Sequence, residues 1–334
     1  MGADFTPVRR AAHHLPQPDE PELRIHVREC RPAEPGRPAG AILFVHGATF
    51  ASAIWDIGLP GMSFLERAAQ VGMAAYALDV RGYADSPSQA MAKAAAPYAR
   101  AQQAVRDIDL VADFIRSREG CERILLVGGS WGTITGGCYA AGAGKGKLSG
   151  LVLHAPIFAE TNSGWLDLIA DPGNRQRPNP ALGAFRQVTE AEARIRWDAE
   201  IPEGSVAQFR DETVLAAMMR DEIAAGLPPG ADVPSALRVP NGALLDLFEA
   251  YSLRPLYDPA DITMPTLLLR GSRDTTSTRS DALALFDRLG TRVKRYVEIS
   301  HGTHFIGAER QAWQVQEAVL AFAGSIFLAR AAAF

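Results

Sequence analysis

A serine flanked by glycines marks the segment 128–132, which reads Gly-Gly-Ser-Trp-Gly. An apolar run at 123–127 comes directly before it, and a helical pattern at 131–141 follows. A serine on so sharp a strand-to-helix turn has a strained backbone, which is tolerated where glycines let the strand and the helix approach closely. Its hydroxyl then projects above the sheet, and the next amide points into the same space. This context favours Ser130 as a nucleophile over an ordinary glycine-rich turn.

A serine hydroxyl needs a base to take its proton and a carboxylate to orient that base. Asp274 follows a strand predicted at 266–269 and is the candidate acid. If Asp274 only caps a helix, Glu160 is the second choice. His301 and His304 follow the last predicted strand, and one of them is the candidate base. All of these segments lie at the carboxyl ends of predicted strands, where open α/β sheets place their sites.

The elements that must position these residues alternate along the chain between apolar runs and helical patterns, which is typical of an α/β fold with a mostly parallel sheet. We expect strands at 23–29, 41–45, 74–80, 123–127, 148–154, 266–269 and 293–299, and helices at 63–71, 99–117, 131–141, 280–289 and 308–329.

This rhythm is interrupted between residues 158 and 261, a stretch far longer than an ordinary connection between strands. Helical patterns at 190–200, 205–225 and 243–251 predict a helical insertion that stands over one edge of the main domain. The expected organisation is therefore an N-terminal extension at 1–21, a core formed by 22–157 and 262–334, and the insertion at 158–261.

Two further motifs lie on the early strands. The segment 44–49 reads Phe-Val-His-Gly-Ala-Thr, and 79–82 reads Asp-Val-Arg-Gly. Together with the serine turn and the chain order Ser, Asp, His, these motifs resemble the α/β-hydrolase superfamily over nearly the whole chain after residue 22. The resemblance implies an α/β-hydrolase fold in which the insertion is a cap placed after strand six. It also implies that His46 supports a loop and is not an acid or base.

The resemblance assigns roles to the chemistry-bearing residues. Ser130 would be the nucleophile and Asp274 the orienting acid. His304 is preferred to His301 as the base because the superfamily commonly has Gly-x-His, an aromatic residue and then a glutamate. The segment 302–305 and Glu309 match that pattern.

Backbone N–H groups of Trp131 and Ala48 would form the oxyanion hole, the pair of donors that binds the developing negative charge. Candidates for contact with the substrate are His301, Thr49 and His154. His154 ends the strand before the insertion, where a buried structural histidine is an equal alternative.

Large side chains of the insertion either line an apolar acyl pocket or hold the insertion together, and the second role is expected for most of them. They are Trp165, Phe185, Trp197, Phe209, Met218, Met219, Phe248 and Tyr251.

The leading functional hypothesis is a serine hydrolase that cleaves a carboxylic ester or lactone. The serine turn is also similar to that of proline iminopeptidases, but 46–50, His-Gly-Ala-Thr-Phe, departs from their His-Gly-Gly-Pro-Gly. A peptidase or amidase would be favoured by a carboxylate of the insertion that holds a substrate ammonium. Carbon–carbon bond hydrolases of aromatic breakdown use the same three residue types, and a non-catalytic binding protein is a third class. The carboxylates available for an ammonium are Glu190, Glu192, Asp211 and Glu212.

Composition limits the partners. The 334 residues are 47% hydrophobic and carry a formal net charge of −4, so no basic face for nucleic acid is expected. The longest apolar run is too short to span a membrane. Three scattered cysteines indicate neither disulfides nor zinc. We expect a cytoplasmic protein with a small-molecule substrate and no cofactor or metal, and the sequence leaves open whether it forms a homodimer.

Overall fold

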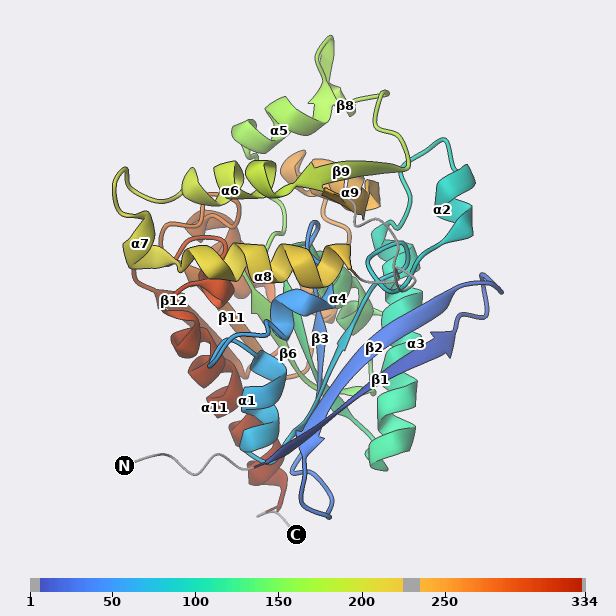
Figure 1. The fold of residues 1–334 in the computed structure, drawn as a ribbon, viewed down its shortest axis with the longest axis vertical. Helices are drawn as coiled ribbons and strands as arrows, with labels where there is room; N and C mark the ends of the chain where they lie inside the picture. Colours follow the sequence, from blue (N-terminus) through green and yellow to red (C-terminus); the bar gives the residue numbers. More distant parts are fainter. Residues whose placement is uncertain (1–6, 225–234, 332–334) are drawn as a thin grey trace.

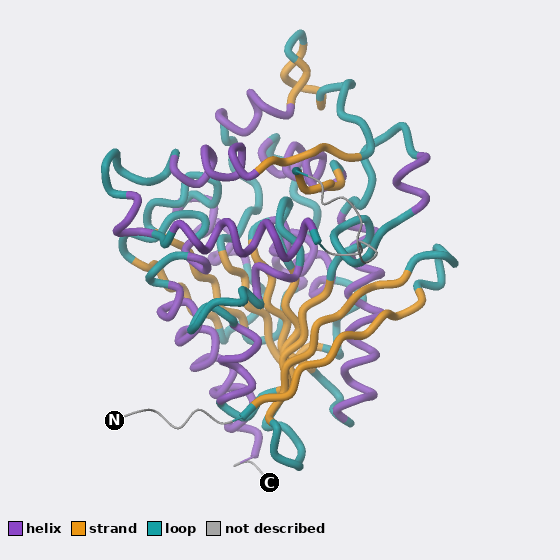
Figure 2. Tube along the Cα trace, viewed as in Figure 1, coloured by secondary structure: helices purple, strands orange, loops and turns teal. Residues whose placement is uncertain are grey.

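One eight-stranded sheet forms the centre of the protein (Figures 1 and 2). The structure is a computed structural model that describes residues 7–224 and 235–331. The strand order is β1-β2-β4-β3-β5-β6-β11-β12, in which β1–β2 and β2–β4 are antiparallel and the other pairs are parallel. The predicted α/β fold with a mostly parallel sheet is thus confirmed. The strands are β1 (Val8–Pro16), β2 (Arg24–Pro32), β3 (Ala41–Val45), β4 (Ala74–Leu78), β5 (Ile124–Gly129), β6 (Leu148–His154), β11 (Thr266–Gly271) and β12 (Lys294–Ile299).

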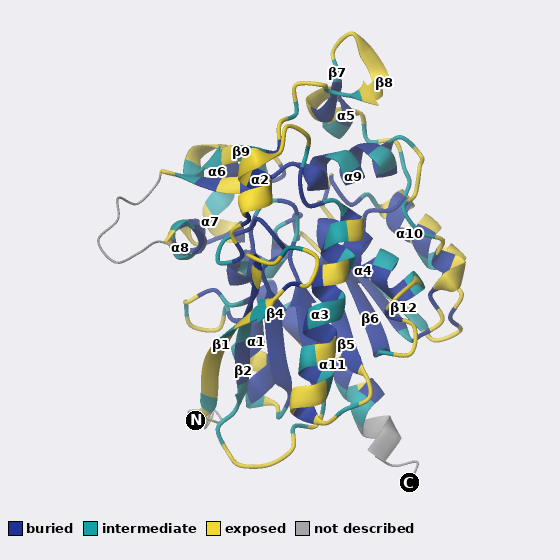
Figure 3. Ribbon diagram, turned by 90° about the vertical axis from the view of Figure 1, so that its right-hand side faces the viewer, coloured by how far each residue is buried: buried dark blue, intermediate teal, exposed yellow. Residues whose placement is uncertain are grey.

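Helices cover both faces of this sheet. Successive residues of a strand point to opposite faces, so Leu43 and Phe44 of β3 enter two different cores. Ile108 packs in the core that contains Leu43, and Val319 packs in the core that contains Phe44. Figure 3 shows the strands buried between the helices. The covering helices are α3 (Ala101–Glu119), α4 (Trp131–Ala141) and α10 (Arg279–Arg288) on one face, and α1 (Phe64–Gln70) and α11 (Ala312–Ala331) on the other.

Short elements complete the core. The last helix, predicted to begin at residue 308, begins at 312, because η3 forms a separate turn of 3₁₀ helix before it. None of the described helices is long and apolar enough to cross a bilayer. The short elements are α2 (Gln89–Lys93) and the 3₁₀ turns η1 (Ser52–Trp55), η2 (Pro259–Asp261) and η3 (Ile306–Ala308).

The segment expected to be an N-terminal extension contributes a strand instead. β1 pairs with β2 along its whole length, from Val8 opposite Pro32 to Pro16 opposite Arg24. Most of its side chains are exposed or only partly buried because it forms the edge of the sheet. Such a strand lacks the apolar run by which the buried strands are recognised.

The insertion between β6 and β11 lies across the end of the sheet from which the strands' carboxyl ends emerge (Figure 1). Besides the expected helices, the insertion contains two short antiparallel pairs, β7–β8 and β9–β10, which the sequence analysis did not predict. The helix expected at 205–225 is divided, since Asp211 caps a new helix by accepting a hydrogen bond from the N–H of Thr213. The elements are α5 (Ser163–Ile169), β7 (Ala170–Asp171), β8 (Asn174–Pro178), β9 (Phe185–Thr189), α6 (Glu190–Asp198), α7 (Val206–Phe209), α8 (Glu212–Ile223), β10 (Ala236–Pro240) and α9 (Gly242–Tyr251).

Candidate active site

Ser130 occupies the sharp turn between β5 and α4. Its backbone has φ +54° and ψ −120°, a conformation that an L-residue adopts at a cost of about 1–3 kcal/mol. The flanking glycines make the turn possible. A Cβ on Gly128 would lie 2.1 Å from the carbonyl oxygen of Gly132, and one on Gly132 would lie 2.5 Å from that of Val45. The crowding explains why the sequence places glycine on both sides of the serine.

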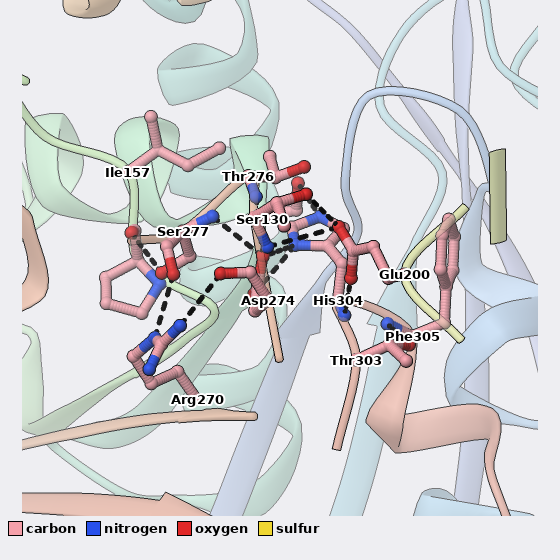
Figure 4. Close-up of polar contacts among 12 residues, drawn as sticks. Ser130, Ile157, Glu200, Arg270, Asp274, Thr276, Ser277, Thr303, His304 and Phe305 are labelled. Carbon is pink, nitrogen blue, oxygen red and sulfur yellow. Dashed lines mark hydrogen bonds and ion pairs between the residues drawn. The ribbon is translucent and has the colours of Figure 1, made fainter. Parts of the chain in front are cut away.

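His304 connects Ser130 to Asp274 (Figure 4). Its Nε2 atom lies 2.9 Å from Ser130 Oγ, and its Nδ1 atom lies 2.9 Å from both carboxylate oxygens of Asp274. With Nδ1 protonated toward the carboxylate, Nε2 is the acceptor that faces the serine hydroxyl. The structure therefore brings together all three residues that the sequence analysis selected.

The loop that carries Asp274 is held rigidly after β11. The N–H groups of Thr276 and Ser277 donate to Asp274 Oδ1 over 2.9 and 2.8 Å. Arg270 donates to the carbonyl oxygens of Asp274 and Ser277, both over 2.8 Å. Burial alone would raise the pKa of Asp274, but the charge and hydrogen bond of His304, the Ser277 N–H and the charge of Arg270 lower it below its usual value. Asp274 is thus held as a carboxylate.

Two alternatives from the sequence lie elsewhere. Glu160 accepts hydrogen bonds from the hydroxyls of Thr278 and Ser280 at the start of α10, so it is occupied there and does not contact His304. His301, expected to contact substrate, is exposed and does not line the cavity described below. Its backbone has φ +60° and its N–H donates to Ser272 Oγ over 2.9 Å.

The loop after β3 supplies the second candidate oxyanion donor. His46 Nε2 accepts a hydrogen bond from the Val80 N–H over 3.0 Å, and Nδ1 contacts the Gly47 carbonyl oxygen at 2.8 Å. Burial lowers the pKa of His46 despite that carbonyl and the charge of Asp79, so the ring is neutral. These bonds give His46 the structural role expected for it.

Two side chains also hold the loop after β3 through the carbonyl group of Ala48. The Ala48 carbonyl oxygen accepts hydrogen bonds from Tyr83 Oη over 3.2 Å and from Arg186 Nη2 of the insertion over 2.9 Å. Within the described ranges, the N–H groups of Ala48 and Trp131 donate to no protein acceptor. Both amides are available to a ligand that reaches Ser130.

A cavity of about 730 Å³, counted with its open mouth, surrounds Ser130 and His304. Thr49 and His154 line it, as the sequence analysis proposed. The other lining residues are mostly apolar and include Phe50, Ile54, Trp55, Phe64, Trp165, Leu247 and Phe305. Trp165 is the sole member of the predicted set of large insertion side chains to line the cavity, so the others mainly pack within the insertion.

His154 is neutral in this setting. Desolvation by burial, reinforced by the positive charge that His304 carries when protonated, lowers the pKa of His154 to about 4. Its Nε2 atom has no hydrogen-bond partner among the described residues, and its ring packs against Trp55.

The insertion contributes a residue that the sequence analysis missed. Glu200, just after α6, accepts a hydrogen bond from the His304 N–H over 2.7 Å. Its other oxygen accepts from Thr275 Oγ1 over 2.7 Å and from the Thr275 N–H over 3.2 Å. One carboxylate thus ties the loop of the base to the loop of the acid (Figure 4). No motif marks Glu200, because its role depends on how the insertion docks on the core.

The carboxylates that were candidates for binding a substrate ammonium are engaged on the outside of the insertion. Glu190 and Glu212 pair with Arg194. Glu192 and Asp211 cap the starts of α6 and α8. None of the four lines the cavity.

Across the described ranges, one group of three potential metal ligands lies close enough to share an ion, and it is His26, Asp79 and Asp85. Asp79 already accepts hydrogen bonds from the Ser52 N–H over 2.8 Å and from the Asp85 N–H over 3.2 Å, and it pairs with His26 at 2.9 Å. Burial would raise the pKa of Asp79, but His26 and Ser52 lower it to about 2. The carboxylate of Asp79 is thus already engaged in hydrogen bonds within the fold.

Comparisons with known proteins agree with this fold. A family model described as the alpha/beta hydrolase family matches residues 42–317. Among solved structures, an esterase from Thermogutta terrifontis has a TM-score of 0.62 at 16% identity, covering 96% of this chain and 99% of that one. A hydrolase from Pseudomonas aeruginosa PA01 has a TM-score of 0.61 at 18% identity, with coverages of 94% and 98%.

An epoxide hydrolase from Vigna radiata is similar to the same extent, with a TM-score of 0.60 at 15% identity and coverages of 97% and 100%. At such identities the likeness shows the fold alone. No curated protein matches the sequence. The extent of the family match shows that the chain belongs to the alpha/beta hydrolase family.

Proposed function

We propose that this hydrolase is serine-dependent and cleaves a carboxylic ester or lactone of a small, largely apolar substrate through an acyl-enzyme. The observation that carries the proposal is the position of His304, 2.9 Å from Ser130 Oγ on one side and 2.9 Å from Asp274 on the other, at the floor of an apolar cavity. This is the arrangement that nucleophilic catalysis by serine requires.

In the first half-reaction, His304 Nε2 takes the proton of Ser130 as Oγ bonds to the acyl carbon. Asp274 stabilises the resulting imidazolium through its hydrogen bonds to Nδ1. The N–H groups of Ala48 and Trp131 donate to the oxyanion, a contribution typically of about 3–4 kcal/mol per donor. The intermediate then collapses, and the leaving alkoxide takes the proton from His304 Nε2.

In the second half-reaction, His304 removes a proton from water as the water oxygen attacks the acyl carbon of the Ser130 ester. The same two amides bind the second oxyanion. Collapse releases the carboxylic acid and returns the proton to Ser130 Oγ, so no group outside these residues is needed to balance the reaction.

Charge in the cavity favours an ester over the amino terminus of a peptide. Among the described lining residues, the carboxylates proposed to hold an ammonium are absent, and the charged side chain present is the guanidinium of Arg196. A cationic substrate would be repelled by this group. This supports the ester or lactone reading over the peptidase reading.

A panel of chromogenic substrates tests the function. p-Nitrophenyl butanoate and its amide analogue butanoyl p-nitroanilide share one acyl group, and alanine and proline p-nitroanilides carry a free ammonium. We expect turnover of the ester and little turnover of either ammonium-bearing amide. Valerolactone is a further substrate, and its hydrolysis is followed by the release of acid. Ser130→Ala should abolish ester turnover while leaving the circular dichroism spectrum unchanged. Faster cleavage of the ammonium-bearing amides, or turnover retained in Ser130→Ala, would contradict the proposal.

A further inference from the structure

A guanidinium lies in the mostly apolar cavity. Arg196 of α6 lines the cavity together with Ser130 and His304. Its guanidinium carbon lies 4.6 Å from the ring centre of Trp165 and 5.6 Å from that of Phe305, and Nη2 donates to Thr276 Oγ1 over 2.9 Å. Two aromatic rings and one hydroxyl therefore hold the charged group beside the reacting residues.

Arg196 has no counter-ion in the part of the chain that the structure describes. Within residues 7–224 and 235–331, no carboxylate comes within 4.0 Å of its guanidinium. Other arginines of the insertion do have partners, since Arg194 pairs with Glu190 and Glu212, and Arg210 pairs with Asp198. The insertion thus contains acidic side chains, but these pair with arginines other than Arg196.

Such a group is costly to hold without a partner. Burial lowers the pKa of Arg196, although the more distant charges of Glu200, Tyr251 and Asp274 oppose the shift. A desolvated cation beside a binding site is stabilised when an anion completes it. The missing negative charge is therefore one that a bound ligand can supply.

The donors needed for that ligand are accessible. Within the described part of the chain, one hydrogen bond uses the Arg196 guanidinium, which has five N–H donors. Its remaining nitrogens are not among the sealed, unpartnered polar atoms, and the residue lines the cavity. A planar guanidinium with two adjacent free donors matches a carboxylate in bidentate geometry.

We propose that the preferred substrate of this site carries a carboxylate in addition to its ester bond, and that Arg196 binds this carboxylate. The half-esters of short aliphatic dicarboxylic acids have this chemistry, with an apolar chain between an anion and a scissile ester. The proposal rests on the proposed function, because it names the class of ester that Ser130 attacks.

Ligand binding to a variant that cannot hydrolyse esters tests whether the site prefers a carboxylate. Ser130→Ala would be titrated calorimetrically with monoethyl succinate, glutarate and adipate. Each is compared with the neutral ester in which a methyl replaces the carboxylate, namely ethyl butanoate, pentanoate and hexanoate. We expect at least one half-ester to bind about tenfold tighter or more than its neutral counterpart, as an ionic hydrogen bond allows.

Three further variants in the Ser130→Ala background assign the effect. Arg196→Gln should remove the preference for a half-ester over its neutral counterpart. Arg196→Lys should keep part of this preference, because the positive charge remains but the planar pair of donors is lost. Arg194→Gln, on the same helix but paired outside the cavity, is the matched control and should keep the full preference. Equal binding of every half-ester and its neutral counterpart, or a preference that survives Arg196→Gln, would overturn the proposal.

The outcomes separate this inference from the proposed function. If the half-esters bind through Arg196 but wild-type protein hydrolyses neither them nor p-nitrophenyl butanoate, the proposed ester hydrolysis is refuted and the carboxylate site stands. If wild-type protein hydrolyses the neutral esters but Ser130→Ala shows no preference for the half-esters, the hydrolase stands and the carboxylate site is refuted.

Discussion

His154 makes a quantitative prediction about pH and stability. It lines the cavity yet is only 6% exposed, and burial followed by the charge of His304 lowers its pKa from 6.5 to about 4. The folded protein therefore keeps His154 neutral down to about pH 4, whereas the unfolded chain binds this proton as the pH falls through 6.5. Between these values the unfolded state holds more protons, so stability rises with pH and is lost on acidification.

The magnitude follows from the two pKa values. Between pH 7 and pH 5, the shift of His154 should lower the free energy of unfolding by about 2 kcal/mol, out of a limit of about 3 kcal/mol once both states are protonated. Replacement by glutamine keeps a polar side chain but removes the ionisation. The loss of stability between pH 7 and pH 5 should thus be smaller by about 2 kcal/mol in His154→Gln than in wild type.

Urea unfolding at the two pH values, followed by circular dichroism, measures this difference. Other titrating groups contribute equally to both proteins and cancel in the comparison. His301→Gln is the control, because that side chain is exposed, and it should show the wild-type pH dependence. A His154→Gln protein that loses as much stability as wild type on going to pH 5 would show that the fold does not hold His154 neutral.

Other substitutions test the site itself. His304→Ala should lower kcat/KM by about 10⁴-fold or more while His301→Ala changes it less than about twofold, and the reverse ranking in ester hydrolysis would exchange their roles. Asp274→Asn should lower kcat by about 10⁴-fold by favouring the wrong tautomer of His304, and an unchanged rate would return attention to Glu160. Glu200→Gln should lower kcat about tenfold with little change in KM, because an amide cannot accept from both loops as the carboxylate does, whereas an equal loss through KM would show a role in substrate binding.

The residues around the serine were predictable because local constraints leave marks in the sequence. Gly128 and Gly132 are required where a Cβ would meet backbone atoms, and such crowding occurs at a strand-to-helix turn. Asp274 and His304 follow apolar strands whose carboxyl ends meet at one edge of a parallel sheet. The choice of His304 over His301 depended on a family pattern, and the structure adds the reason that His301 is exposed.

The insertion shows where sequence patterns stop being informative. Arg194 and Arg196 lie two residues apart on α6, and both are surrounded by acidic residues in the sequence. The way the insertion docks decides that Arg194 pairs outside while Arg196 lines the cavity and Glu200 reaches the loops of His304 and Asp274. β1 was missed for a different reason, because an edge strand need not be apolar.

The activation of Ser130 is the central claim, and its reaction with a fluorophosphonate tests it without a choice of substrate. Purified wild-type protein and Ser130→Ala would be treated with the reagent, and their intact masses compared. The account predicts one adduct on wild-type protein and none on the variant, since it assigns the activation of this hydroxyl to His304, which lies 2.9 Å from Ser130 Oγ and from Asp274. No adduct on wild-type protein, or the same adduct on both, would contradict it.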